Sequence, residues 1–355
     1  MNDLGRHLAD RIRLQGPITI ADYMGTALGH PTWGYYTSRD PLGRAGDFTT
    51  APEVSQMYGE LIGLWCADRW QAMGSPGHFI LAELGPGRGT LMADALRAGG
   101  ALPGFLAAAE IHLVDISPVL RTAQEKALAG RAVTWHDRIV DLPAGPILAI
   151  ANEFFDALPI HQFQRAADGW HERMVDVRDD EFMTVLNPTA TPGAGLAAAE
   201  LHAVFEVSPA RTAAAAELAH HIAGHGGAAL IIDYGHGITA PGDTLQAMRA
   251  HEYTDPFMAP GEADLTSHVD FQTLADAARG AGARTHGPVS QGHFLDQLGI
   301  GARAGRLKTR ATAAQTRDID GALHRLTAQD QMGQLFKVMA VTDMTAPIPP
   351  GFEDA

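Results

Sequence analysis

Residues 79–92 of the 355-residue chain read FILAELGPGRGTLM, and this stretch decides the fold. Residues 79–84 are almost all apolar and have the length of a buried strand. Glycine then follows at alternate positions, and a helix is expected from Thr90. Glycine adopts positive φ without strain and lets a ligand approach the backbone, so Gly85, Gly87 and Gly89 predict a ligand-binding loop between a strand and a helix.

Two familiar glycine loops do not match this spacing. The dinucleotide-binding pattern Gly-x-Gly-x-x-Gly would require glycine where Thr90 stands. The phosphate-binding P-loop requires lysine and then serine or threonine after its last glycine, whereas Gly89 is followed by Thr90 and Leu91. The loop therefore predicts a ligand of another kind.

Short apolar runs alternate with helical patterns after this loop. They lie at 111–114, 132–135, 147–151, 228–232 and 334–342. Nearly continuous hydrophobicity is typical of parallel strands covered on both faces, with the intervening helices as crossovers. We expect an α/β, Rossmann-like fold with insertions at about 160–207 and 236–310. The first insertion suggests a hairpin over 163–185 and is followed by a helix over 208–224.

The first 77 residues read as a mainly helical cap region before an α/β domain of residues 78–345. Thr50 and Glu53 have the spacing of a capping box. Apolar residues then recur at helical spacing from Val54 to Trp65 and predict a helix with one buried face. Cys66 extends that face and is expected to be a buried apolar residue.

Acidic side chains end the strands next to the glycine loop. Glu83 closes the first strand, and Asp115 follows the second, where a carboxylate can accept both ribose hydroxyl groups of an adenosine. Asp137 follows the third strand, at a position suited to the adenine amino group. These three acids and the glycines of the loop are the candidate cofactor-binding residues. As a structural alternative, the loop is only a tight connection and Asp115 caps a helix.

The charge balance limits the partners of the protein. The chain has 26 Lys and Arg against 41 Asp and Glu, a formal net charge of −15. This charge repels phosphate backbones, so we expect no nucleic-acid partner and a preference for cationic ones. The single cysteine excludes an intrachain disulfide and a cysteine-based zinc site, and it fits a reducing compartment. No metal site is expected.

Targeting signals and membrane spans are also not expected. The N-terminal residues lack the apolar core of a signal peptide and the acid-poor character of a transit peptide. The apolar runs are far shorter than the roughly 20 residues of a membrane helix. The sequence therefore predicts a cytoplasmic protein without membrane insertion.

Several segments resemble the MidA-type methyltransferases, a family that includes the mitochondrial complex I assembly factor that methylates arginine. The resemblance covers nearly the whole chain. It rests on HPTWGYY (30–36), GDFTTAPE (46–53), ELGPGRGTL (83–91), NEFFDALP (152–159), IDYG (232–235) and GEADLTSHVDF (261–271). It implies a seven-stranded class I core that binds S-adenosyl-L-methionine, a helical cap, and methyl transfer to an accessible arginine of a protein substrate. Asp115 is a minor departure, since relatives often have glutamate there.

The acceptor side of such a site is expected after the fourth strand. Methyl transfer from a sulfonium is an in-line displacement, so the protein must hold a desolvated nucleophile against the methyl group. Glu153 and Asp156 could clamp a guanidinium and help to remove its proton, and both are candidate catalytic residues. Asn152 is a further candidate cofactor contact. The structural alternative is that Asn152 and Glu153 cap a helix and Asp156 begins a turn.

Other residues are candidates for substrate contacts. Phe154 and Phe155 could each pack against a cationic group, one of the two is expected in the core, and Phe155 is the candidate for the site. The resemblance suggests that Asp47 and Phe48 fold over the cofactor, although an exposed turn is an alternative. Asp233 ends the fifth strand at the same edge, where it could contact substrate or cap the next element.

Two further interpretations stay open. His268 and Asp270 could be a base and its orienting partner, but capping of a helix before Phe271 is simpler. The protein could also be a non-catalytic assembly factor that binds the cofactor, or a methyltransferase acting on a small-molecule or nucleic-acid amine. Asn152 suggests the amine, but that signature continues with Pro-Pro-aromatic, from which Glu153 departs. A homodimer is possible.

Overall fold

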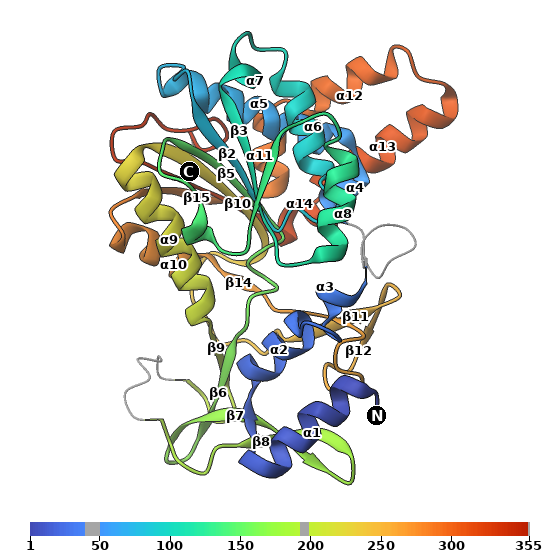
Figure 1. Cartoon of the computed structure of the whole chain (residues 1–355), viewed down its shortest axis with the longest axis vertical. Coiled ribbons are helices and arrows are strands. Elements are labelled where there is room, and N and C mark those ends of the chain that lie inside the picture. Colours follow the sequence, from blue (N-terminus) through green and yellow to red (C-terminus); the bar gives the residue numbers. More distant parts are fainter. Residues whose placement is uncertain (40–49, 192–198, 354–355) are drawn as a thin grey trace. The chain divides into compact units, whose positions relative to one another are not determined.

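The computed structural model describes residues 1–39, 50–191 and 199–353, which fall into two compact units (Figure 1). Unit 1 is built from Met1–Phe48, Asp156–Thr212 and Ile238–His268. Unit 2 is built from Thr49–Phe155, Ala213–Gly237 and Val269–Ala355. Each unit therefore combines three stretches that are far apart in the sequence.

A central sheet organises unit 2. Within the described residues its strands run in the order β15-β16-β10-β5-β2-β3-β4, and the short β14 pairs with the end of β10. All strands along this order are parallel except β16, which is antiparallel to both of its neighbours. The strands are β2 (Phe79–Leu84), β3 (Ala109–Val114), β4 (Val133–His136), β5 (Ile147–Asn152), β10 (Gly227–His236), β14 (Val269–Asp270), β15 (Arg284–Ser290) and β16 (Phe336–Thr342). The Rossmann-like, seven-stranded fold is thereby confirmed.

Helices cover this sheet. They are α4 (Ala51–Val54), α5 (Gln56–Ala72), α6 (Thr90–Gly99), α7 (Phe105–Ala108), α8 (Pro118–Ala127), the 3-10 helix Ile139–Asp141, α9 (Pro209–His225), α10 (Phe271–Gly280), α11 (Gln291–Gln297), α12 (Ile300–Lys308), α13 (Ala313–Thr327) and α14 (Met332–Leu335). Helix α5 packs closely on α6, because Gly63 has no side chain where a Cβ would lie 2.3 Å from the carbonyl oxygen of Ala95. The helices and strands enclose one large apolar core, with Trp65, Phe79 and Leu230 fully buried.

Unit 1 combines helices with two small antiparallel sheets. Its helices are α1 (Asp3–Gln15), α2 (Ile20–Gly29) and α3 (Tyr35–Ser38). One sheet runs β1-β7-β6-β9 with β8 paired to β7, and the other runs β12-β11-β13. Their strands are β1 (Ile18–Thr19), β6 (His161–Ala166), β7 (Gly169–Arg178), β8 (Glu181–Leu186), β9 (Val204–Val207), β11 (Gln246–Arg249), β12 (Glu252–Thr254) and β13 (Asp264–Thr266). The hairpin in the first insertion is thereby confirmed.

The predicted capping box is wrong. Thr50 precedes the short α4 but makes no side-chain cap, and Glu53 accepts a hydrogen bond from the Thr90 hydroxyl at 2.6 Å instead. A break follows at Ser55, whose hydroxyl accepts from the backbone N–H of Met57 and starts the longer helix α5. Helix α5 is buried on most sides rather than on one face, because it lies between the sheet, α6 and α12.

The observed units divide the chain differently from the prediction. The helix α5 belongs to unit 2, whereas the sequence pattern places it in the cap region of residues 1–77. The proposed insertion at 236–310 also contains β15, an outer strand of the central sheet. The sequence of β15, RTHGPVS, has few apolar residues, and most of its side chains are exposed or half-buried. The apolar pattern therefore could not reveal it.

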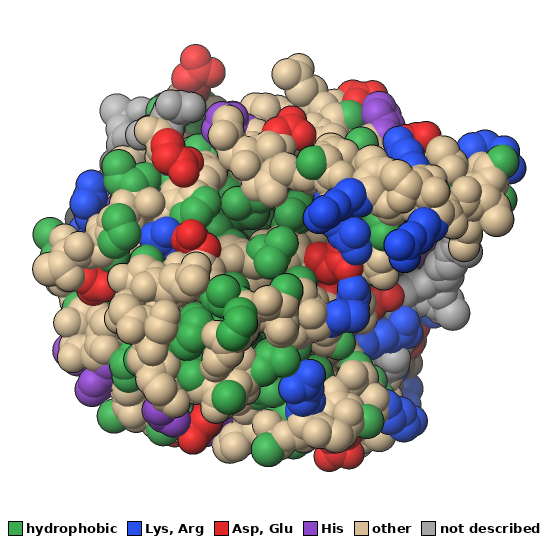
Figure 2. Space-filling view, turned by 90° about the horizontal axis from the view of Figure 1, so that it is seen from above, with side chains coloured by type: hydrophobic (Ala, Val, Ile, Leu, Met, Phe, Trp, Pro, Cys, Tyr) green, Lys and Arg blue, Asp and Glu red, His purple; other side chains and the backbone are tan. Residues whose placement is uncertain are grey.

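The surface of unit 2 is unevenly charged. In the view of Figure 2, Lys and Arg side chains gather toward the right-hand side, where α12 and α13 project in Figure 1. Among the described residues, no helix is long and apolar enough to cross a membrane. The same part of the chain holds no group of three His, Cys, Asp or Glu side chains placed to bind a metal ion.

Candidate active site

The glycine loop follows the fully buried strand β2. Gly85, Gly87 and Gly89 have φ of +61°, +54° and +82°, in the left-handed region that favours glycine. The backbone N–H of Gly85 donates to the carbonyl of Val114 at 2.9 Å, which joins the loop to the end of β3. A Cβ on Gly85 would lie 3.1 Å from the ring of Phe154. The loop therefore has the backbone that the sequence predicted.

Glu83 lies beneath this loop as a buried acid. It accepts a hydrogen bond from the backbone N–H of Met92, and Oε2 has no hydrogen-bond partner in the described part of the chain. Burial raises the pKa of Glu83 to about 8; the bond from Met92 acts in the opposite direction, and the nearby Asp115 adds to the rise. An acid with an unpartnered oxygen next to a glycine loop fits a ligand that carries a positive charge or a donor.

Asp115 is held at the end of β3. Its carboxylate accepts from the backbone N–H of Ser117 at 2.8 Å and from Nε2 of Gln124 at 2.7 Å. Gln124 also donates to the carbonyl of Gly87 at 2.8 Å, so one side chain ties the acid to the glycine loop. Burial raises the pKa of Asp115, although these hydrogen bonds oppose it. Each carboxylate oxygen still has a lone pair with which to accept a ribose hydroxyl.

Asp137 lies after β4, but its carboxylate is exposed. Its side chain is 72% accessible and pairs with Nη2 of Arg121 at 2.6 Å. Arg121 also donates to the backbone carbonyls of Asp115 and His136. The arginine thus joins the ends of β3 and β4. Because the carboxylate of Asp137 is exposed to water, a hydrogen bond from a ligand would gain less there than at the half-buried Asp115.

Asn152 and Glu153 end strand β5. The side chain of Asn152 accepts from the hydroxyl of Tyr58 and donates to Oε1 of Glu153 at 3.2 Å. The same Oε1 accepts from the backbone N–H of Ala51 at 3.2 Å. Glu153 itself has a φ of +51°, which is uncommon for a residue with a side chain and is often found at functional sites. Asn152 and Glu153 thus form one hydrogen-bonded group with α4 and α5.

Tyr58 acts as a donor in this group. Burial, followed by the charges of Glu153, Asp233 and Glu83, holds the pKa of Tyr58 well above its usual range. The hydroxyl therefore keeps its proton and fixes the orientation of the Asn152 amide. Tyr58 and Gln124 were missed from the sequence, where Tyr58 read only as part of the apolar face of a helix.

Comparisons with known proteins agree with this geometry. A family described as putative S-adenosyl-L-methionine-dependent methyltransferase matches residues 61–289. The chain belongs to this methyltransferase family. The protein arginine methyltransferase NDUFAF7, mitochondrial, of Xenopus tropicalis is 40% identical, with 96% of this chain and 86% of that protein covered. The mouse protein of the same name is also 40% identical, with 95% and 83% covered.

A solved structure extends the comparison to the fold. A likely methyltransferase of the COG1565 superfamily from Burkholderia thailandensis, bound to S-adenosyl-homocysteine, has a TM-score of 0.89 and 30% identity. The match covers 99% of this chain and 95% of that one. The methyltransferase therefore uses S-adenosyl-L-methionine, as the resemblance implied. The glycine loop, Glu83 and Asp115 would hold this cofactor, which supplies the activated methyl group.

The predicted localisation is wrong. The vertebrate and insect relatives are named as mitochondrial proteins, which contradicts a cytoplasmic protein. The single cysteine indicates only a reducing environment, and such an environment is not restricted to the cytoplasm. Composition therefore could not name the compartment.

The two aromatic residues after Glu153 have different surroundings in the methyltransferase. Phe155 is fully buried, so its ring belongs to the core rather than to a substrate contact. Phe154 is half-buried, packs edge to face on Phe155 at 5.3 Å and lies beside Gly85. Asp233 is also fully buried and accepts from the backbone N–H groups of Phe155 and Tyr234 at 3.0 Å each. Phe154 is thus the better candidate for a substrate contact, and Asp233 holds the segment in place.

Asp156 falls in unit 1, whereas Glu153 falls in unit 2. The side chain of Asp156 is buried, and its backbone carbonyl accepts from Ser267 at 3.2 Å and from Arg211 at 2.9 Å. Its charge helps to raise the pKa of Tyr36, after burial and the charge of Asp264. The role of Asp156 in a clamp stays a prediction.

The remaining candidates divide into structural and undescribed residues. Asp270 caps α10 by accepting from the backbone N–H of Gln272 at 3.0 Å and of Thr273 at 3.2 Å, so the capping interpretation is confirmed. His268 lies in the other unit, where its backbone N–H donates to Thr244 at 2.9 Å. Asp47 and Phe48 lie outside the described residues.

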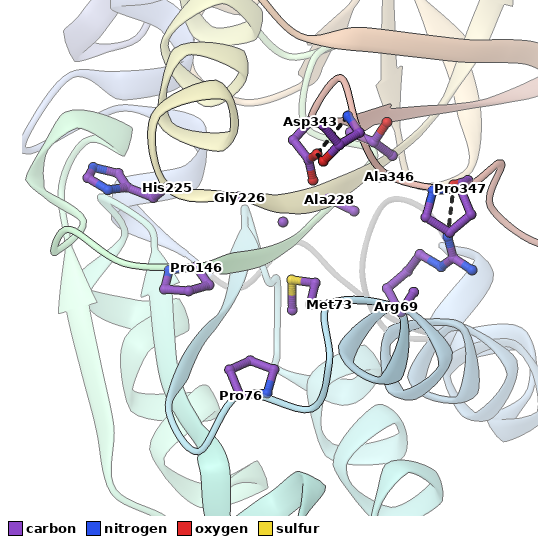
Figure 3. Close-up of a pocket in the computed structure, with 14 residues that line it drawn as sticks. Arg69, Met73, Pro76, Pro146, His225, Gly226, Ala228, Asp343, Ala346 and Pro347 are labelled. Carbon is purple, nitrogen blue, oxygen red and sulfur yellow. Dashed lines mark hydrogen bonds between the residues drawn. The ribbon is translucent and has the colours of Figure 1, made fainter.

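A pocket of about 360 Å³ lies at the opposite edge of the sheet from the glycine loop (Figure 3). It is lined by the start of β10, the chain after β16 and the end of α5. Its charged side chains are already bonded, since Arg69 donates to Asp68 and to the carbonyl of Pro347, and Asp343 accepts from Thr345. The pocket is therefore not a second candidate for the cofactor.

Proposed function

We propose that the protein transfers a methyl group from S-adenosyl-L-methionine to an arginine side chain of a protein, and that Glu153 receives the guanidinium. The relatives named as arginine methyltransferases support an arginine acceptor. The resemblance to the MidA-type family adds the expectation that the target is similar to a subunit of respiratory complex I. The observation that carries the proposal is the carboxylate of Glu153, fixed at the end of β5 by Asn152 and Ala51.

The chemistry follows from this placement. Oε1 of Glu153 accepts the N–H groups of Asn152 and Ala51, and a carboxylate is the group that pairs best with the N–H groups of a guanidinium. A carboxylate in this place can orient the nucleophilic nitrogen and take the proton that becomes acidic as the nitrogen is methylated. The half-buried ring of Phe154, which lies beside Gly85, can pack against the cationic group.

Glu153→Gln is the test of this role. The amide keeps the size of the side chain but loses its charge, so we expect most of the cofactor affinity to remain and turnover to fall about 100-fold or more. Single-turnover methylation of an arginine-containing protein is followed by intact mass, and cofactor affinity is measured by calorimetry on the same sample.

The matched control is Glu217→Gln, the same change at an exposed position of α9 in unit 2. It should leave both measurements unchanged. A wild-type rate for Glu153→Gln contradicts the role of Glu153. A methylated residue other than arginine contradicts the acceptor, and tight cofactor binding without turnover on any protein supports the non-catalytic assembly factor instead.

A further inference from the structure

The helices α12 and α13 form a basic hairpin on an acidic protein. Residues 300–327 contain six Lys and Arg against two Asp, a formal charge of +4, whereas the whole chain carries −15. The basic residues are Arg303, Arg306, Lys308, Arg310, Arg317 and Arg325, and the acidic ones are Asp318 and Asp320. The Lys and Arg side chains on the right of Figure 2 lie on the side where this hairpin projects.

Some of these cationic side chains form ion pairs within unit 2. Arg303 donates to the buried Glu60 of α5, which also binds Arg97 of α6. Burial alone would raise the pKa of Glu60, but the hydrogen bonds from Arg303 and Arg97 outweigh it and keep the acid charged. Lys308 pairs with Asp320 across the hairpin. These contacts join the hairpin to α5 and its two helices to each other.

Three other cations are not neutralised. Arg306, Arg310 and Arg317 are exposed and have no ion pair among the residues that the structure describes. The apolar residues of α13, such as Ile319 and Leu326, face the core of unit 2. The hairpin thus packs on one side and presents unpaired positive charge on the other.

The position of the hairpin connects it to the acceptor side. Helix α13 packs against α4, and the N–H of Ala51 in α4 donates to Glu153. A polypeptide whose arginine reaches Glu153 would therefore have neighbouring residues within reach of α13. All of these elements belong to unit 2.

We propose that the α12–α13 hairpin binds an acidic stretch of the protein substrate, close in the substrate to the arginine that is methylated. This inference rests on the proposed function. Charge complementarity selects the occupant, because three unpaired arginines attract carboxylates. A long polyanion such as RNA would also meet the negative field of the remaining surface, whereas a short acidic segment needs to match the hairpin alone.

The test uses two labelled peptides with one arginine each, identical except that glutamates next to the arginine in one are glutamines in the other. The full-length protein should bind the glutamate peptide about tenfold more tightly at low salt, and this preference should vanish near 0.5 M salt, where charges are screened within about 5 Å. The triple variant R306E/R310E/R317E should lose the preference. Its KM for the glutamate peptide should rise about tenfold at unchanged kcat.

The matched control is R131E/R279E/R284E, which makes the same charge change at exposed positions of unit 2 away from the hairpin. It should keep the preference. Fluorescence anisotropy measures peptide binding without any methylation. If the protein prefers the glutamate peptide but methylates neither peptide, the proposed function is contradicted and the docking surface is not.

Four outcomes overturn the docking surface. The first is equal binding of the two peptides by the wild type, and the second is an unchanged preference in R306E/R310E/R317E. The third is tighter binding of single-stranded RNA, or of vesicles with anionic lipid, that is lost in the same variant. The fourth is a dimer that becomes a monomer in that variant, which would make a second copy of the chain the occupant.

Discussion

The two edges of the central sheet in unit 2 both carry charged side chains, but they differ in how far the chain itself supplies their hydrogen bonds. At the edge with the glycine loop, Glu83 has an unpartnered oxygen within the described chain, and burial raises the pKa of Glu83 and of Asp115. At the opposite edge, Arg69 and Asp343 are bonded to neighbouring residues. Burial alone would raise the pKa of Asp343, but bonds from Thr345 and from backbone N–H groups outweigh it.

The difference shows why the pocket of about 360 Å³ at the opposite edge is not proposed as the cofactor site. A ligand gains affinity where it completes hydrogen bonds that the protein leaves unmade, because a buried polar group without a partner is costly. The pocket at the opposite edge offers volume but few such groups. The edge with the glycine loop offers Glu83, Asp115 and a backbone that a ligand can approach.

The largest effect is expected at the glycine loop. Gly87→Val places a branched side chain at a φ of +54°, where it opposes the backbone and fills the space of the ligand, so cofactor affinity should fall more than about 100-fold. Gly74→Val is the control, since Gly74 has a φ of +83° in open space at the end of α5. It should lose similar stability but no affinity. Calorimetric titration and thermal unfolding are measured on both, and wild-type affinity in Gly87→Val contradicts the assignment of the loop.

The next effect concerns the acid on β3. Asp115→Ala removes a carboxylate that is tied to Gln124 and Ser117, and cofactor binding should weaken by about 1–3 kcal/mol, the scale of lost charged hydrogen bonds. Asp343→Ala at the opposite edge should lower the melting temperature and leave cofactor affinity unchanged. Equal cofactor affinity in the two variants would contradict the proposed difference between the two edges.

The pH dependence of stability should have opposite signs at the two edges. The pKa of Glu83 is raised to about 8 in the folded state. Its contribution to the free energy of unfolding is therefore complete below its unfolded pKa and is lost as pH rises through about 8. The pKa of Asp343 is lowered, so its contribution is present above its unfolded pKa and is lost as pH falls through the folded value.

The two amide variants measure this directly. Glu83→Gln should become more stable relative to wild type as pH rises from acidic to alkaline. Asp343→Asn should lower the free energy of unfolding most at neutral pH and least at acidic pH. We expect small differences in melting temperature, about 1–2 °C for each kcal/mol in a chain of 355 residues. The same pH response in both variants would show that their environments do not differ.

The smallest effect is expected for Asp137. Its carboxylate is 72% exposed and already paired with Arg121, and exposed pairs contribute about 0–1 kcal/mol. Asp137→Ala should therefore weaken cofactor binding by no more than about fivefold. A loss comparable to that of Asp115→Ala would give Asp137 a direct contact with the cofactor and extend the binding edge to β4.

The residues that could be predicted are those whose role depends on nearby sequence. The glycine loop, Glu83 and Asp115 follow directly from strands with strong apolar patterns, and the structure places all of them at one edge of the sheet. Gln124 and Tyr58 could not be found in this way. Their partners are Gly87 and Asn152, which lie 37 and 94 residues away in the sequence.

Local patterns also failed where tertiary contacts compete with them. Thr50 and Glu53 have the spacing of a capping box, but Glu53 binds the hydroxyl of Thr90 instead. Phe154 and Phe155 are neighbours of the same type, and only packing separates the buried ring from the accessible one. Strand β15 lacks the apolar pattern of the inner strands because most of its side chains are exposed or half-buried, and its backbone pairing with β16 holds it at the edge of the sheet.

The sequence by itself determined the parallel strands, the glycine turn and the acids that follow the strands, because each depends on periodicity, positive φ or position within about ten residues. Only the tertiary structure decided which acids keep hydrogen-bonding capacity for a ligand. Among the residues that the structure describes, it left Oε2 of Glu83 without a hydrogen-bond partner, bonded both oxygens of Asp233 to backbone N–H groups, and paired the exposed Asp137 with Arg121. The physical reason is that burial and hydrogen bonding are set by residues brought together from distant parts of the chain.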